Sequence, residues 1–280
     1  FTGLAVALAF RAGLFNVGVE GQLYVGGFAA AVAGAYLPLP GALLGIAALL
    51  AAAIAGGLWG AIPGALKARF GAHEVINTIM LNFVAFSLVS WAGRALFVTA
   101  TVHTRDVGEG AWLPRLDTFV AGMRGAPVNL SLLLGLLLAA VTGLLLFRTR
   151  LGYELRAVGL NASAAEFGGV SIGRAQLLAM ALSGAIAGLG GSNFVLGYKH
   201  YFELGLSGGA GFIGIAVALL GRNHPVGVIV ASLFFGALSY GALVVNTRVP
   251  RELVEVLMAL VILFAICARP LLERAARRWA

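Results

Sequence analysis

The stretch GALLGIAALLAAAIAGGLWGAIPGAL, at residues 41–66, decides the fold class because it contains no charged side chain. It is longer than the roughly 20 apolar residues with which an α-helix crosses about 30 Å of hydrocarbon. Similar stretches recur along the whole chain, whereas a secretory signal would be one short stretch at the start. We therefore predict an all-α, polytopic integral membrane protein.

The composition of the chain agrees with this class. Hydrophobic residues make up 60% of the 280 residues and charged residues 11%, whereas a soluble domain carries about 25% charged residues. The chain begins with Phe1, inside an apolar stretch, so we expect that an upstream segment is missing and that residues 1–10 end a further span. Eight complete spans are predicted, at residues 22–37, 41–66, 75–97, 127–147, 172–197, 205–221, 225–245 and 252–268.

The charges predict how the chain is oriented. A net charge of +8 is compatible with nucleic-acid binding, but membrane proteins concentrate Arg and Lys in their cytoplasmic loops, so we expect no nucleic-acid partner. A cytoplasmic C-terminus gives the cytoplasmic segments a clear excess of basic residues and leaves the external segments balanced. This orientation makes residues 148–171 a cytoplasmic loop and residues 99–126 an external loop.

Two parts of the chain resemble each other. Residues 18–34 align without gaps on residues 205–221, and residues 73–81 resemble residues 251–259. Chance similarity among common glycines and alanines is the alternative. The matched spans lie five crossings apart, so a repeat would be inverted in the membrane, as in many transporters that bind substrate near the repeat interface. About ten helices, as five plus five, are then expected in the complete protein.

Polar residues within or beside the predicted spans are the candidates for a substrate pathway, because an unpartnered polar group in lipid is costly. Neutral amides and hydroxyls suit an uncharged polyhydroxylated solute such as a nucleoside. Hydrogen bonding between helices, without solute contact, is the alternative. The candidates are Asn16, Glu20, Gln22, Asn77, Thr78, Asn82, Asn193 and Ser207.

The sequence predicts no catalytic residue, metal site or cofactor. A P-loop requires Gly-Lys-Ser/Thr, and neither Lys67 nor Lys199 has that context. The four histidines are scattered and do not form the spacing of a metal site. The GxGxxG pattern at residues 209–214 lies in an apolar span, so we interpret it, like Gly56, Gly60 and Gly64, as helix packing. Energy must come from a partner or from an ion gradient.

The loop at residues 148–171 contains a signal for a short helix. Ser163 and Glu166 have the spacing of a capping box, which predicts a helix that begins at Ser163 and is stopped by Gly168 and Gly169. A short capped helix on a basic loop suits docking into a groove of a cytoplasmic partner. A plain solvated loop is the alternative.

Four segments, in this order along the chain, resemble the nucleoside branch of bacterial ABC-type permeases, within the larger group that serves simple sugars and branched-chain amino acids. The resemblance covers nearly the whole chain and implies one permease domain over residues 1–280, in the bacterial plasma (inner) membrane. It implies import of nucleosides or a related simple sugar. The segments are FRAGLFNVGVEGQLYVGG (10–27), HEVINTIMLNFVA (73–85), LGYELRAVGLNASAAEFGGVSIGR (151–174) and GFIGIAVALLGRNHPVG (211–227).

The resemblance also implies partners and a coupling site. ATP hydrolysis is expected on a cytoplasmic ATPase subunit, with a second, related permease chain and an extracytoplasmic substrate-binding lipoprotein. The turn at residues 16–22 resembles the glycine-rich break near the translocation path. A gradient-driven secondary transporter of small polar solutes is the alternative function. The coupling positions implied are Arg156, Asn161, Ser163, Ala164, Ala165, Glu166 and Gly168.

Overall fold

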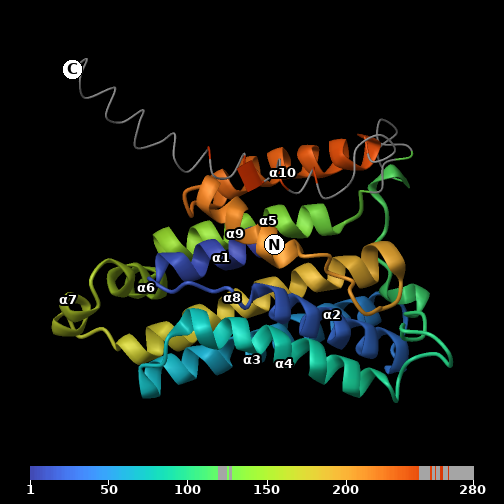
Figure 1. Ribbon diagram of the computed structural model, residues 1–280, viewed down its shortest axis with the longest axis horizontal. Coiled ribbons are helices and arrows are strands. Elements are labelled where there is room, and N and C mark those ends of the chain that lie inside the picture. The colour runs from blue at the N-terminus through green and yellow to red at the C-terminus, as the bar shows by residue number, and fades with distance from the viewer. Residues whose placement is uncertain are drawn as a thin grey trace.

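The computed structural model describes residues 1–118, 125 and 128–245, together with 253, 256, 259, 260 and 264. In this part of the chain the regular elements are helices (Figure 1), and five of them are long and apolar enough to cross a membrane. The all-α, polytopic class is therefore confirmed. The predicted span at residues 252–268 lies outside the continuous described ranges. The five helices are α3 (Gly41–Phe70), α4 (Glu74–Gly93), α5 (Ser131–Arg148), α8 (Ile172–Phe194) and α10 (Pro225–Val245).

The remaining elements are shorter or less apolar. Helix α8 runs into a π-helical turn, η4 (Val195–Lys199). The predicted span at residues 205–221 is wrong at its start, because α9 begins only at Ala210, after Gly205, Gly208 and Gly209 with positive φ angles. The other elements are α1 (Thr2–Arg11), α2 (Val19–Tyr36), α6 (Arg150–Leu160), α7 (Ala162–Phe167), α9 (Ala210–Leu220) and the 3₁₀ turns η1 (Glu109–Ala111) and η2 (Leu116–Thr118).

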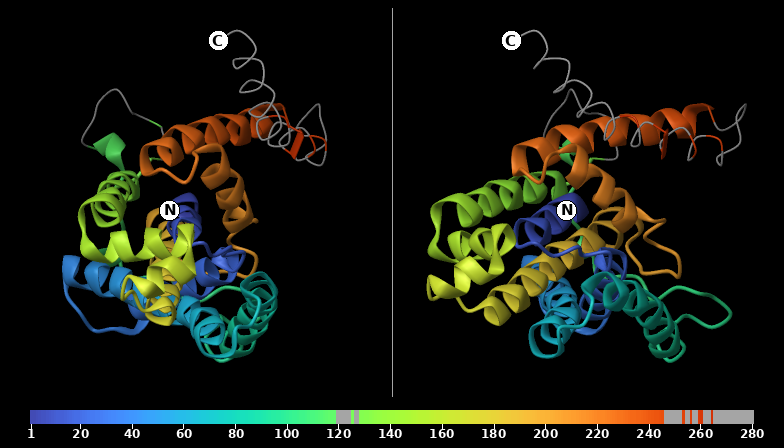
Figure 2. Two further views of the ribbon diagram at one scale, coloured as in Figure 1. Left: turned by 90° about the vertical axis from the view of Figure 1, so that its left-hand side faces the viewer. Right: turned by 60° about the vertical axis from the view of Figure 1, so that its left-hand side comes forward.

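Helix α8 is the central element of the bundle. Of its apolar window 61% is buried inside the protein, compared with 22% for each of the other four long helices. Figure 2 shows α5, α9 and α10 on one side of α8 and α3 and α4 on the other. The apolar faces that α3, α4, α5 and α10 leave uncovered suit contact with lipid.

Glycines allow α3 to approach α8 closely, as predicted for helix packing. A Cβ at Gly56 or Gly60 would overlap the backbone carbonyls of Gly184 and Met180 on α8. The backbones therefore touch without intervening side chains, the usual device for packing helices in a membrane. Pro63 does not end α3, which continues to Phe70.

The helix ends form two groups. At one end α6 and α7 project from the bundle, and at the opposite end the chain from α4 to α5 packs beside the loop that follows η4 (Figure 1). The Arg11 Nε atom donates to the Asn223 carbonyl at 2.8 Å, and the Arg11 and Arg156 guanidinium groups lie 5.6 and 5.4 Å from the centre of the Phe147 ring. Arg11 and Arg156, two basic residues expected on the same side of the membrane, therefore lie close together at the α6–α7 end.

Candidate functional site

Asn16, in the turn between α1 and α2, is the centre of a buried amide cluster. Its Nδ2 donates to Gln22 Oε1 at 2.9 Å and to Ser183 Oγ at 2.8 Å, and Gln22 Nε2 donates back to Asn16 Oδ1 at 3.1 Å. Ser183 Oγ in turn donates to the Ala5 carbonyl at 2.7 Å. Asn16 and Gln22 are each 1% exposed, so their amide groups join the α1–α2 turn to α8 and do not face an open path.

Asn82 on α4 makes a second buried connection to the same turn. Its Oδ1 accepts from the Gly21 nitrogen at 2.9 Å and its Nδ2 donates to the Val17 carbonyl at 3.1 Å. A Cβ at Gly21 would lie 2.8 Å from that oxygen, so a larger residue there would displace the Asn82 side chain from this hydrogen bond. Asn82 thus replaces backbone partners that the turn lacks.

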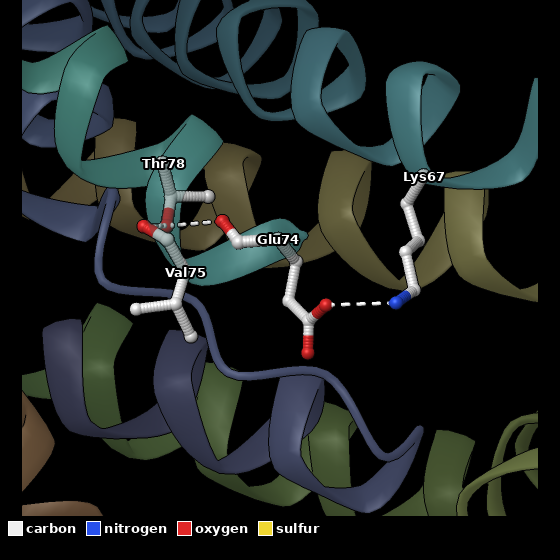
Figure 3. Close-up of polar contacts among 4 residues, drawn as sticks. All are labelled: Lys67, Glu74, Val75 and Thr78. Carbon is white, nitrogen blue, oxygen red and sulfur yellow. Dashed lines mark hydrogen bonds and ion pairs between the residues drawn. The ribbon is translucent and has the colours of Figure 1, made fainter. Parts of the chain in front are cut away.

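Polar contacts of Lys67, Glu74 and Thr78 lie at the turn between α3 and α4. Thr78 Oγ1 donates to the Glu74 carbonyl at 2.7 Å, within its own helix. Lys67 Nζ, from the last turn of α3, lies 2.9 Å from Glu74 Oε2, as Figure 3 shows. Thr78 is fully buried, so its hydroxyl stabilises the start of α4. The Lys67–Glu74 ion pair was not anticipated from the sequence.

Glu20 is a carboxylate buried at the contact between α2 and α9. Its Oε2 accepts from the Gly211 nitrogen at 2.6 Å, and the residue is 3% exposed. Both residues lie in the first turn of a helix, where the helix dipole stabilises a negative charge. Five predicted pathway residues are therefore buried, and their polar groups bond to the protein: Asn16, Glu20, Gln22, Thr78 and Asn82.

A cavity of about 910 Å³ lies among α1, α5, α8, α9 and α10. Its wall is mostly apolar. Asn193 is the predicted residue that lines it, and Ser207 lies beside the lining residue Leu206. The polar groups in the wall come from Thr2, Asn129, Ser131, Asn193, Tyr198, Lys199, Ser232 and Ser239.

Three side chains form a polar cluster in this wall. Asn193 Oδ1 accepts from Asn129 Nδ2 at 3.1 Å and from Ser131 Oγ at 2.5 Å. Asn129 and Ser131 were not predicted, because polar residues just before an apolar stretch are typical of an ordinary helix start. Asn77 does not belong to this wall, and its Nδ2 is buried without a hydrogen-bond partner among the described residues.

The projecting arm consists of α6 and α7. The predicted capping box is wrong: α7 begins at Ala162, and the cap is Asn161, whose Oδ1 accepts from the Ala164 nitrogen at 3.0 Å. Asn161 is extended, with φ −159°, which ends α6 and places its side chain over the first turn of α7. Helix α6 was not predicted. The stop after Phe167 is confirmed, and Gly169 has φ +82°.

The arm is attached to the bundle and exposes apolar side chains at α7. Ala165 is 7% exposed and belongs to the main core, whereas Ser163, Ala164, Glu166 and Gly168 are exposed. Arg156 packs on Phe147. Leu160, the last residue of α6, and Phe167, the last residue of α7, are 89% and 95% exposed and lie outside the five long apolar helices. Sequence reasoning missed both, because isolated apolar residues in a loop carry no pattern.

Close backbone contacts hold the arm in place. A Cβ at Gly152 would overlap the Leu145 carbonyl of α5, and one at Gly159 would overlap the Arg11 carbonyl at the end of α1. Helix α6 therefore packs backbone to backbone on the end of α5 and on the end of α1, just before the turn that contains Asn16.

Comparison with known proteins gives a consistent family. A family model described as "Branched-chain amino acid transport system / permease component" matches residues 1–266. The guanosine ABC transporter permease protein NupP of Bacillus subtilis is 43% identical over 94% of this chain and 76% of its own length. The glucose ABC transporter permease protein TsgB13 of Haloferax volcanii is 38% identical over 94% and 72%.

A further relative is the nucleoside ABC transporter permease protein NupB of Lactococcus lactis. It is 33% identical over 94% of this chain and 74% of its own length. No solved structure matches the chain.

Proposed function

The chain belongs to the family of permease components of branched-chain amino acid transport systems, and from that premise we propose that it carries nucleosides, or a related simple sugar, into the cell. It is a transmembrane permease subunit of an ABC transporter. The solute class is supported by relatives named for guanosine, nucleosides and glucose. We propose one permease domain over residues 1–280, in agreement with the match over residues 1–266.

We propose that the α6–α7 end faces the cytoplasm, and with it the C-terminus. Arg11, Arg148, Arg150 and Arg156 gather at this end, and basic residues are concentrated on the cytoplasmic side of membrane proteins. Residues 99–126 then belong to the external side.

The single observation that carries the coupling role is the exposure of Leu160 and Phe167 on an arm fixed to the bundle. Such apolar anchors contribute most of the binding free energy when they fill a pocket of a partner. The partner we propose is a cytoplasmic ATPase subunit, which would hydrolyse ATP. A related second permease and an extracytoplasmic binding lipoprotein complete the proposed transporter.

For the pathway we propose the cavity that Asn193 lines. Its amide and hydroxyl groups are neutral, and the ring of Tyr198, which is 60% exposed, is available for stacking on a base. The clusters around Asn16 and Asn82 instead hold the helices together. Ser207 is proposed as a residue beside the path.

The test is uptake by the transporter reconstituted in liposomes with its ATPase, second permease and binding lipoprotein. Phe167→Ala should abolish ATP-dependent guanosine uptake and loosen ATPase binding, whereas Phe83→Ala, on the exposed face of α4, should leave both unchanged. Uptake by this chain alone, driven by an ion gradient without ATPase, would instead establish a secondary transporter.

A further inference from the structure

Two side chains on one face of α2 bind the backbone at the start of α9 and in the segment just before it. Glu20 Oε2 accepts from the Gly211 nitrogen at 2.6 Å, and Tyr24 Oη, one helical turn further along, accepts from the Gly205 nitrogen at 3.2 Å. The two contacts grip both ends of residues 205–211, whose sequence is GLSGGAG. This segment connects the loop after η4 to α9.

Three glycines in residues 205–211 are needed for their backbone conformation and not for close packing. Gly205, Gly208 and Gly209 have φ angles of +83°, +53° and +83°, and a Cβ at any of them would meet nothing within 4 Å. Gly211 differs, because a Cβ there would lie 2.5 Å from the backbone of Glu20. A turn that requires glycine backbone conformations therefore leads into a closely packed contact between α9 and α2.

Glu20 and Tyr24 have different surroundings. Among the described residues Glu20 has no ion-pair partner within 4 Å, so its charge depends on the first turns of α2 and α9 and on the short, charge-assisted bond to Gly211. The Tyr24 ring makes edge contacts with Phe86 and Phe202, with centroids 5.0 Å apart in both pairs. Breaking either bond leaves a backbone N–H without its partner.

The gripped segment also forms part of the cavity wall. Leu206 and Ala210, at its two ends, line the cavity, whereas Ser207 between them is 7% exposed. The rest of α9 is held against α1: Thr2 Oγ1 donates to the Ala210 carbonyl at 3.1 Å, and a Cβ at Gly214 would lie 2.5 Å from Thr2 Oγ1. Residues 205–209 differ from α9 in containing three glycines whose Cβ positions are open.

We propose that Glu20 and Tyr24 form a latch that holds the two ends of residues 205–211 and keeps this segment closed over the cavity, and that release of this latch opens the cavity during transport. The gate role rests on the proposed function, whereas the latch itself is a property of the resting protein. Glu20 and Tyr24 are positioning residues in this proposal: they act on the glycine segment and do not bind the solute.

The test measures exposure of the segment in the assembled, resting transporter, without solute or ATP. Cys267 is the only cysteine, so Cys267→Ala with Ser207→Cys gives a single reporter for a membrane-impermeant maleimide. With the latch intact, labelling should be slow. Tyr24→Phe keeps the ring and removes the hydroxyl, and should speed labelling about threefold to tenfold. Glu20→Gln keeps the shape and removes the charge, and should speed it about tenfold or more.

The matched control is Ser192→Ala. Ser192 is also buried, and its Oγ donates within its own helix to the Leu189 carbonyl at 2.7 Å, so labelling should stay slow. Wild-type labelling rates in inserted Tyr24→Phe and Glu20→Gln proteins would overturn the latch, as would equal acceleration by Ser192→Ala. If the Glu20→Gln protein fails to insert into the membrane, the labelling rate of Tyr24→Phe alone tests the latch. Absence of both nucleoside and sugar uptake by the wild type would refute the proposed function without changing these labelling rates.

Discussion

The Asn82 side-chain oxygen lies 2.9 Å from the backbone nitrogen of Gly21, so α4 is hydrogen-bonded to the first turn of α2. Both atoms are buried, and the same side chain donates to the Val17 carbonyl. One residue of a long apolar helix therefore fixes the path of the chain through a turn that begins about 60 residues earlier.

Replacing Asn82 by Leu should destabilise the protein by about 1–3 kcal/mol, because a buried N–H and a carbonyl lose their partners. Thermal unfolding of the purified protein in detergent measures this loss. Met80→Leu, on the exposed side of α4, is the control and should unfold like the wild type. Equal stability of Asn82→Leu and wild type would show that the contact contributes nothing.

Replacing Gly60 by Val should cost about 1–3 kcal/mol of stability, because the added atoms would overlap the Met180 carbonyl and force α3 away from α8. Gly241 on α10 has open space around its Cβ position, so Gly241→Val should have a much smaller effect. Thermal unfolding in detergent compares the stability of the two variants. An equal loss of stability in both would contradict the close α3–α8 contact.

Asn161→Ala should weaken α7 by about 0.5–2 kcal/mol, because Asn161 is its N-cap. Ser163→Ala should have no such effect, since the Ser163 side chain does not cap the helix. Hydrogen exchange of the amides at Ala164 and Ala165, followed by mass spectrometry, separates the two. Faster amide exchange in Ser163→Ala than in Asn161→Ala would show that Ser163 caps the helix, as the sequence predicted.

Asn193→Ala should weaken guanosine binding up to about tenfold, the effect of about one lost hydrogen bond, if the cavity is the pathway. Ser183→Ala should leave affinity unchanged, because Ser183 bonds only inside the Asn16 cluster. Calorimetric titration of the assembled transporter with guanosine measures both. If Ser183→Ala binds guanosine more weakly and Asn193→Ala does not, the solute pathway lies at the Asn16 cluster and not at the cavity.

His200, just after η4, should make the protein sensitive to acid. Burial lowers the pKa of His200, and the positive charge of Arg115 acts in the same direction while Asp106 opposes it. The unfolded chain then binds the proton more tightly than the folded protein. Stability should therefore fall as the pH drops below about 6.5, the usual pKa of histidine, and should be unaffected above it.

Thermal unfolding between pH 5 and pH 8 measures this dependence. His200→Asn should reduce this pH dependence, because asparagine does not titrate. Asparagine is chosen because it tolerates the left-handed backbone that His200 adopts, with φ +65°. His103→Asn is the control and should keep the acid sensitivity. An unchanged pH profile in His200→Asn would assign the sensitivity to another group. The His200 ring also stacks on Trp112, with centroids 4.0 Å apart, so tryptophan fluorescence offers a second signal.

The sequence by itself determined the membrane class and much of the helix order. Apolar length is a local property, so α3, α5, α8 and α10 followed from their own residues. The spacing of Gly56 and Gly60 likewise indicated close helix packing, and the structure supplies α8 as the partner. The four segments that resemble nucleoside permeases led to the family that the match over residues 1–266 confirms.

Only the tertiary structure decided what the polar residues do. Asn16, Glu20 and Asn82 are amides and a carboxylate in an apolar chain, which suits a solute path or a helix contact equally well. Their partners are distant in sequence: Glu20 and Gly211 are 191 residues apart. The cap of α7 was misread for a related reason, because Asn161 became the cap only once its backbone extended between two helices. Hydropathy acts through each residue's own solvent preference, whereas a hydrogen bond needs two groups that folding alone brings together.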